Sequence, residues 1–294
     1  MNYTGDVLNF GMAVEKAKAS GLDTDMVVVG DDAGVGRAAG GKVGRRGIAG
    51  TVLVQKIAGA LAATGASLKE VSAVASLVAD NTVSIGSSLA HVHVPGRSKA
   101  DVEDELKLEE IEVGMGIHNE AGSERTTAEL PALVEKMLKY MLDPSDKDRA
   151  FLSVSKSDET VVLVNNLGGV SPLEMGGVAN EVLEQLEKTY GIKPARVLCG
   201  TYMTSLNGLG FSISILKLAD TGLGLSMLEL LDAPAEANGW YAAVTTKTWQ
   251  DRSNATVKHD KSADIESKPS GLASKSHCVR PRISDVDMFQ WTPR

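Results

Sequence analysis

Short apolar runs alternate with amphipathic stretches along most of the chain. β-Branched residues dominate the apolar runs, and glycine or polar residues bound them at strand length. They predict strands at residues 26–29, 90–94, 111–117, 160–165, 195–200 and 211–216. Apolar residues at helical spacing predict helices between them, among them residues 47–64 and 68–79. This alternation is typical of an α/β fold in which helices flank central sheets.

Polar residues mark three predicted helix starts. Asp6 precedes a helical apolar period, and aspartate is among the residues preferred at a helix N-cap. Thr126 with Glu129, and Ser171 with Glu174, have the spacing of a capping box. A carboxylate fixed at a helix start is also well placed to act as a general base, so both roles stay open for Asp6.

Length and composition predict the domain organisation. At about 150 residues per domain, 294 residues suggest two folded units. Small and turn-forming residues gather at 81–88, so we expect two α/β units, an incomplete one over residues 1–84 and a second over 85–236. Residues 237–294 have few apolar positions, which indicates a linker or disordered tail. An incomplete sheet exposes strand edges, so we expect residues 1–84 to be the less stable unit.

Charge and composition argue against several classes of protein. Lys and Arg total 30 and Asp and Glu total 38, so the net charge is −8. Such a chain lacks the general basic character of proteins that bind nucleic acid or anionic membranes. No apolar run is long enough to span a bilayer, and the first residues do not resemble a secretory signal. With only two cysteines, these features favour a cytoplasmic protein.

Glycine and basic residues are concentrated between residues 30 and 50. The stretch holds eight glycines and four Lys or Arg residues, a combination that suits phosphate. Residues 36–42 approach a P-loop, but Val43 stands where Ser or Thr would hold Mg²⁺. Residues 34–39 approach a dinucleotide-binding turn, but no acid for the ribose follows before Glu70. We therefore interpret the stretch either as a loop that contacts an anion or partner, or as a mobile surface loop.

His118 has the clearest setting for chemistry among the histidines. It follows the predicted strand 111–117, and Gly114 and Gly116 share its face, which leaves room for a ligand beside the imidazole. A surface histidine or a hydrogen-bonded structural histidine fits the same pattern. His118 is therefore a candidate site residue, with Asp6 as a candidate general base.

The remaining histidines and cysteines give weaker signals. His91 and His93 share one face of the predicted strand 90–94, but no third metal ligand is evident, and an outward polar face also explains them. Cys199 lies in an apolar strand and is interpreted as an inert core thiol. Cys278 lies in the predicted tail as a free thiol. We therefore expect no metal site.

Two loops follow predicted strands, at the ends where α/β proteins bind ligands. Residues 165–171 lead into a helix N-terminus, and residues 201–210 follow another strand. Both loops are candidates to line one crevice, although a capped turn and an ordinary loop explain them as well.

Six short motifs follow one another along the chain. They are N-Y-T-G-D-V-L-N-F (2–10), G-D-D (30–32), G-R-R-G-I-A-G-T (44–51), G-I-H-N-E (116–120), N-N-L-G-G (165–169) and G-T-Y-M-T-S (200–205). Each is weak alone, but in this order they resemble the substrate-binding domain of dihydroxyacetone (glycerone) kinases. The H-V-H-V-P-G sequence at 91–96 is similar to the eukaryotic, ATP-dependent single-chain branch.

The resemblance implies roles for two residues. His118 matches the family histidine that adds to the carbonyl of dihydroxyacetone or glyceraldehyde and forms a covalent hemiaminal, a reaction that glycerol cannot undergo. Asp6 matches the family carboxylate that accepts the proton of the hydroxyl being phosphorylated. The resemblance also implies a homodimer, with ATP and Mg²⁺ on a separate helical domain that docks near residues 30–50, and no cofactor on this chain itself.

Departures from the family leave two functions open. The family carries a Gly-His-Glu-Pro motif that also holds the substrate, and a helical ATP domain, and neither is evident in this sequence. Ala121 stands where a proline is usual. We therefore expect either the substrate-binding component of a kinase, inactive alone, or a catalytically incompetent protein that binds a triose or a partner.

Overall fold

One mixed sheet organises the described part of the computed structural model, which comprises residues 1–41, 43–92, 94–96, 106–118 and 120–240. Its strands are β1 (Thr82–Ala90), β2 (Ile111–Val113), β3 (Glu124–Thr126), β4 (Thr160–Asn166), β5 (Arg196–Gly200) and β6 (Leu209–Lys217). Their order is β3-β2-β1-β6-β4-β5, with β4 and β5 parallel and the other neighbours antiparallel. The predicted α/β class is confirmed.

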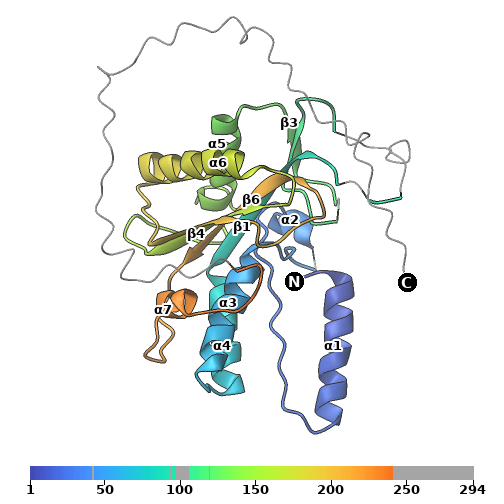
Figure 1. Ribbon diagram of the computed structural model, residues 1–294, viewed down its shortest axis with the longest axis vertical. Coiled ribbons are helices and arrows are strands. Elements are labelled where there is room, and N and C mark those ends of the chain that lie inside the picture. Colours follow the sequence, from blue (N-terminus) through green and yellow to red (C-terminus); the bar gives the residue numbers. More distant parts are fainter. Residues whose placement is uncertain (42, 93, 97–105, 119, 241–294) are drawn as a thin grey trace, which may run out of the picture. The chain divides into compact units, whose positions relative to one another are not determined.

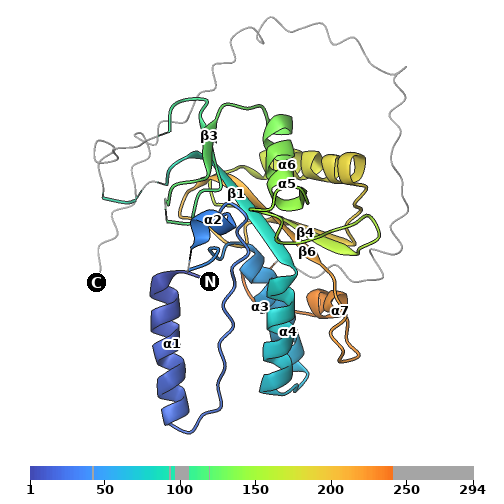
Figure 2. The ribbon, with the colours of Figure 1, turned by 180° about the vertical axis from the view of Figure 1, so that it is seen from behind.

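Helices cover both faces of this sheet (Figure 1; Figure 2). One face carries α5 (Leu130–Leu142), α6 (Pro172–Gln185) and the π-helical turn η2 (Leu186–Tyr190), and the other carries α3 (Gly50–Ala63), α4 (Leu68–Asp80) and α7 (Met227–Asp232). Successive strand side chains point to opposite faces. In β4, Val162 and Val164 therefore join the core under α5 and α6, while Val161 and Leu163 join the core under α3 and α4.

The N-terminal arm, which we define as α1 (Thr4–Ala19) with residues 20–29, extends away from the sheet on the side that carries α3 and α4 (Figure 1; Figure 2). No residue of α1 is buried. The base of the arm is nevertheless fixed, because the side chain of Asn2 donates to the carbonyls of Val43 and Arg45 at 2.8 and 2.7 Å. The backbone N–H of Asn2 also donates to the carbonyl of Val29 at 2.9 Å. The short helix α2 (Arg37–Gly40) follows the arm.

Several predicted strands differ from those observed. Residues 26–29 are not assigned to a strand, and β1 ends at Ala90, the first residue of the predicted strand 90–94. The predicted strand 111–117 stops at Val113, because Gly114 has a φ of 75° and turns the chain. Strand β1 itself was not predicted, because serine and glycine occupy positions where apolar residues were expected.

Strand β1 also crosses the expected boundary between residues 84 and 85. It pairs with β6 from Thr82 to Ala90, so residues on both sides of that boundary belong to one strand. The described part of residues 1–84 forms no sheet of its own. Helices α3 and α4 pack instead on the common sheet, and the described residues belong to one compact unit. Within the predicted tail 237–294, residues 241–294 lie outside the described part.

Of the three predicted helix caps, the structure confirms one. Ser171 and Glu174 form the capping box of α6. The box expected from Thr126 and Glu129 is wrong, because Thr126 ends β3 and Glu129 is the N-cap of α5 without a side-chain hydrogen bond. The N-cap role of Asp6 is also wrong, since the N-cap of α1 is Tyr3 and Asp6 lies within the first turn of the helix. Within the described residues, no helix is long and apolar enough to cross a membrane.

Candidate functional site

His118 lies on the turn that follows β2, where Glu120 fixes its side chain. The imidazole Nδ1 lies 2.7 Å from one Glu120 carboxylate oxygen, and the other oxygen accepts the backbone N–H of His118. Burial raises the pKa of Glu120, but these hydrogen bonds outweigh it and hold that pKa below its ordinary value. An ionised carboxylate at Nδ1 favours the tautomer that carries its proton there, which leaves Nε2 with a free lone pair. The His118 side chain is 59% exposed.

The start of α1 reaches the same turn through Tyr3. The Tyr3 ring meets the His118 ring edge-on, with 4.6 Å between the ring centroids. Burial, and next the charge of Glu120, raise the pKa of the Tyr3 hydroxyl well above its usual range, so it stays protonated. At a rise of about 1.5 Å per residue, Asp6 lies about one helical turn beyond Tyr3. The sequence-predicted base and histidine therefore lie on segments that meet at Tyr3.

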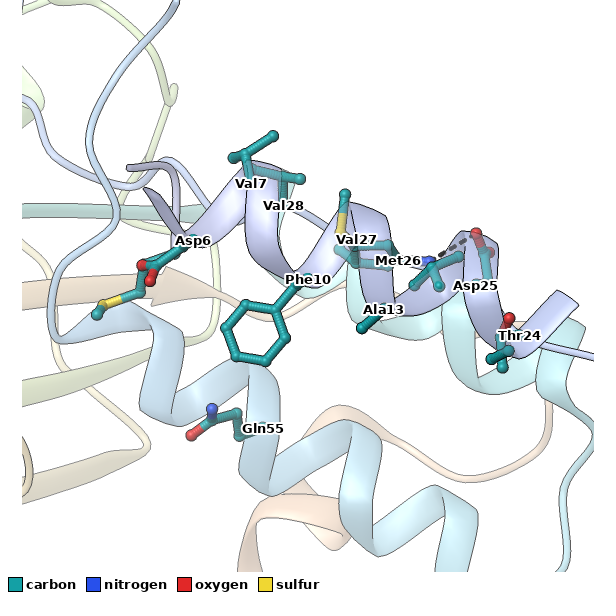
Figure 3. A pocket seen from close by; sticks show the side chains of 13 residues that line it. Asp6, Val7, Phe10, Ala13, Thr24, Asp25, Met26, Val27, Val28 and Gln55 are labelled. Atoms are coloured by element: carbon teal, nitrogen blue, oxygen red, sulfur yellow. Dashed lines mark hydrogen bonds between the residues drawn. The ribbon is translucent and has the colours of Figure 1, made fainter. Parts of the chain in front are cut away.

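Asp6 opens onto a groove of about 540 Å³ between α1 and residues 24–28 (Figure 3). In Figure 3, Phe10 extends from α1 toward Gln55 on α3. The groove is mainly apolar, with Asp6 and Asp25 among its charged residues. His118 is not among its lining residues, so the described residues do not bring His118 and Asp6 into one cavity.

The side chain of Asp31 binds backbone N–H groups within the glycine-rich stretch 30–50. Its buried carboxylate accepts the N–H groups of Ile48 and Gly50, each at 2.8 Å, at the start of α3. Burial raises the pKa of Asp31, against the lowering effect of its hydrogen bonds. These N–H groups are the donors that a phosphate at this helix end would need, and Asp31 already takes them. Lys42 of the near P-loop lies outside the described residues.

Asp32 connects the same stretch to the turn of His118. Its carboxylate lies 2.8 Å from the Arg46 guanidinium, which also donates to the carbonyl of Gly114. Burial raises the pKa of Asp32 to about 6, although the charge of Arg46 works in the opposite direction. A Cβ added at Gly34 would lie 2.7 Å from the Cα of Gly114, so the two backbones pack directly together. This end of the stretch is therefore structural, not a mobile loop.

The two predicted ligand loops meet each other and support the His118 turn. The side chain of Asn165 accepts the N–H groups of Tyr202 and Met203, both at 2.9 Å, which joins the loops 165–171 and 201–210. The Ser205 hydroxyl donates to the carbonyl of Ile117 at 2.6 Å. The sequence predicted that these two loops line one crevice, but it did not indicate the contact of Ser205 with Ile117, next to His118.

The other candidate residues take structural positions. His91 pairs with buried Glu112, with 2.9 Å between Nε2 and the carboxylate, whereas His93 lies outside the described residues. Within the described part, no three His, Cys, Asp or Glu side chains are grouped to hold a metal ion. Cys199 is exposed on the edge strand β5, so its interpretation as a core thiol is wrong, although partial burial raises its pKa. Cys278 lies outside the described residues.

Comparisons with known proteins agree with this architecture. Residues 1–239 match the Dak1 domain family. The chain is 46% identical to dihydroxyacetone kinase from Pichia angusta over 298 residues, which cover 97% of this chain and 48% of that protein. The structure of the C. freundii dihydroxyacetone kinase with AMP-PNP and Mg²⁺ aligns with a TM-score of 0.65 and 33% identity, over 83% of this chain and 42% of that one. The dihydroxyacetone kinase operon co-activator Dha-DhaQ aligns with a TM-score of 0.68 and 26% identity, over 79% and 68%.

The chain thus shares its α/β fold with a dihydroxyacetone kinase and with an operon co-activator. The chain is a member of the Dak1 domain family. The resemblance to dihydroxyacetone kinases is confirmed at the level of the family. The chain spans about half the length of the curated kinase relatives that it matches.

Proposed function

We propose that this chain is the substrate-binding part of a dihydroxyacetone kinase and holds the substrate covalently on His118. One observation carries the proposal: Glu120 binds Nδ1 of a histidine whose side chain is 59% exposed. Membership of the Dak1 family supports the choice of substrate. A carbonyl-bearing triose such as dihydroxyacetone or glyceraldehyde would react there, whereas glycerol has no carbonyl.

The covalent step follows from the fixed tautomer. The lone pair on Nε2 of His118 attacks the carbonyl carbon, and an N–C bond forms as the C=O π electrons move onto oxygen. Solvent protonates that oxygen and takes up the proton that leaves Nδ1, so the product is a neutral hemiaminal beside an ionised Glu120. Glu120 therefore fixes the reactive tautomer before the attack and stabilises the imidazolium during it.

We assign Asp6 the role of accepting the proton from the substrate hydroxyl that is phosphorylated. The start of α3 offers no free N–H groups of Ile48 and Gly50 to a phosphate, because Asp31 binds both. We propose that ATP and Mg²⁺, which would supply the phosphoryl group, bind on a separate helical domain. A cytoplasmic homodimer is also our expectation.

Thermal unfolding with and without millimolar dihydroxyacetone tests the proposal. A ligand that binds only the native state raises the unfolding midpoint, by about 2.7 kcal/mol of stability at a hundredfold excess over Kd. We expect this shift with dihydroxyacetone, none with glycerol, and none in His118→Ala. The Asp6→Asn variant should bind normally, because Asp6 acts only in transfer. A shift that persists in His118→Ala would refute the proposed role of His118.

The alternative function is a binding protein without kinase activity. The similarity to the co-activator Dha-DhaQ favours it, because that relative is named for regulation and not for catalysis. Mixing the chain with a helical ATP-binding domain from a dihydroxyacetone kinase distinguishes the two. ATP-dependent phosphorylation of dihydroxyacetone supports the kinase component, whereas carbonyl-dependent binding without turnover supports the alternative.

A further inference from the structure

The turn that carries His118 is anchored at both ends by buried carboxylates. Asp32 acts at the first end through Arg46, which donates to the carbonyl of Gly114. Glu112 acts at the second end, where one of its oxygens accepts the N–H of Gly122 at 2.8 Å. Glu112 therefore lies outside the candidate chemistry but in direct contact with the turn.

Glu112 has few alternative positions. Its side chain is only 4% exposed, and its second oxygen lies 2.9 Å from Nε2 of His91, which is itself 11% exposed. Arg125 lies 3.9 Å from the first oxygen and adds a positive charge. A buried carboxylate with partners on both oxygens is fixed in place, and losing it would leave the buried partners unsatisfied.

The contact at Gly122 is close to the residues that hold the imidazole. A Cβ added at Gly122 would lie 2.5 Å from the carbonyl of Val113, so this point of the turn packs tightly on β2. Glu120, the residue that binds Nδ1 of His118, lies two residues before Gly122. A displacement of Gly122 would therefore move the carboxylate of Glu120 relative to the imidazole.

We propose that Glu112, supported by His91, is a positioning residue for His118. It touches neither the substrate nor the imidazole, and it acts by holding Gly122 so that Glu120 keeps its hydrogen bond to Nδ1. The inference rests on the proposed function for its catalytic meaning, but the tautomer of His118 can be measured without any ligand.

The test compares two substitutions of Glu112 in the full chain. Glu112→Ala removes both acceptors, whereas Glu112→Gln keeps an oxygen for the N–H of Gly122. The ¹⁵N NMR signals of the His118 ring report which nitrogen carries the proton. We expect the wild-type tautomer in Glu112→Gln. In Glu112→Ala we expect a mixture of tautomers and an affinity for dihydroxyacetone lower by about tenfold, the size expected for the loss of one hydrogen bond to a charged group.

Asp232→Ala is the matched control, because it removes another ion-paired carboxylate of low exposure (13%), which lies 2.7 Å from the buried Arg196. It should lower the unfolding midpoint and leave the His118 signals unchanged. If Glu112→Ala lowers the midpoint likewise but keeps the wild-type tautomer and affinity, the positioning role is refuted. Should Glu112→Ala fail to fold, Glu112→Met fills the same space without an acceptor and gives the same test.

The two proposals fail in distinguishable ways. If the wild-type chain does not bind dihydroxyacetone but Glu112→Ala still changes the tautomer, the proposed function is wrong and the positioning role holds. If the wild-type chain binds dihydroxyacetone and Glu112→Ala leaves both tautomer and affinity unchanged, the positioning role is wrong and the proposed function stands.

Discussion

The sheet with its helices and the N-terminal arm differ in how they are held. Strands β1, β4 and β6 are buried almost throughout and contribute to an apolar core on each face. Helix α1 has no buried residue, and Phe10 on it is 63% exposed. The same chain therefore combines a densely packed body with an arm whose base is tied by the hydrogen bonds of Asn2.

This difference between the body and the arm affects the candidate site, because the two candidate residues, His118 and Asp6, lie in different regions. His118 belongs to the body, where Glu120, Ser205 and Arg46 fix its turn. Asp6 belongs to the arm. Binding through His118 should therefore tolerate motion of the arm, whereas any reaction that needs Asp6 depends on where the arm lies.

The largest expected effect is on stability, in paired core and arm substitutions. Ile213→Ala removes a fully buried side chain from the centre of β6 and should cost about 2–5 kcal/mol of unfolding free energy. Phe10→Ala should change it by only about 0.5 kcal/mol, because the ring is already exposed. Urea unfolding measures both. Equal losses would show that the arm is packed as firmly as the body.

The next largest effect is the dependence on pH of the free energy of unfolding, which we expect from Asp32. Its pKa is about 6 in the folded protein against 3.8 for an ordinary aspartate, so the folded state binds more protons between these values. This contribution to stability is therefore present at low pH and lost as the pH rises through about 6. The stability of the wild-type chain relative to Asp32→Asn should fall by about 2 kcal/mol between about pH 4 and pH 7. Unfolding at several pH values measures it, and an increase over that range would mean that the Arg46 pairing outweighs burial.

The smallest effect distinguishes a formed cap from an expected one. Ser171→Ala removes the capping box of α6 and should cost about 1 kcal/mol. Thr126→Ala should cost no more than about 0.5 kcal/mol, because Thr126 makes no cap for α5. Denaturant unfolding of the two variants is the measurement. A comparable cost at Thr126 would restore the capping box that the sequence predicted.

The local pattern of apolar and polar residues predicted those strands and helices whose buried positions are occupied by apolar residues. The run at residues 160–165 is apolar on both faces of its strand, and it forms β4, which is buried on both faces. The sequence did not predict strand β1, because buried positions on it are polar. Ser84 is buried and its hydroxyl lies 2.6 Å from that of Ser214, a polar pair across two strands. Such pairing depends on the register of residues far apart in the sequence, so no local pattern reveals it.

The candidate site was likewise predicted only in part from the sequence. Neighbouring glycines marked His118, but nothing local assigned Asp31 to the N–H groups of Ile48 and Gly50, many residues away. Glu112 was equally hidden, because its partners His91 and Gly122 come from separate segments. Acceptors of backbone N–H groups leave little signal in a sequence, since any residue supplies the donor.

The most direct test of the account uses dihydroxyacetone labelled with ¹³C at its carbonyl carbon. On binding, the account predicts that the ketone signal is replaced by that of a carbon with four single bonds, as a hemiaminal requires. The new signal should be absent with His118→Ala and retained with Asp6→Asn. A bound ligand that keeps its ketone signal, or a new signal that survives in His118→Ala, would contradict covalent binding on His118.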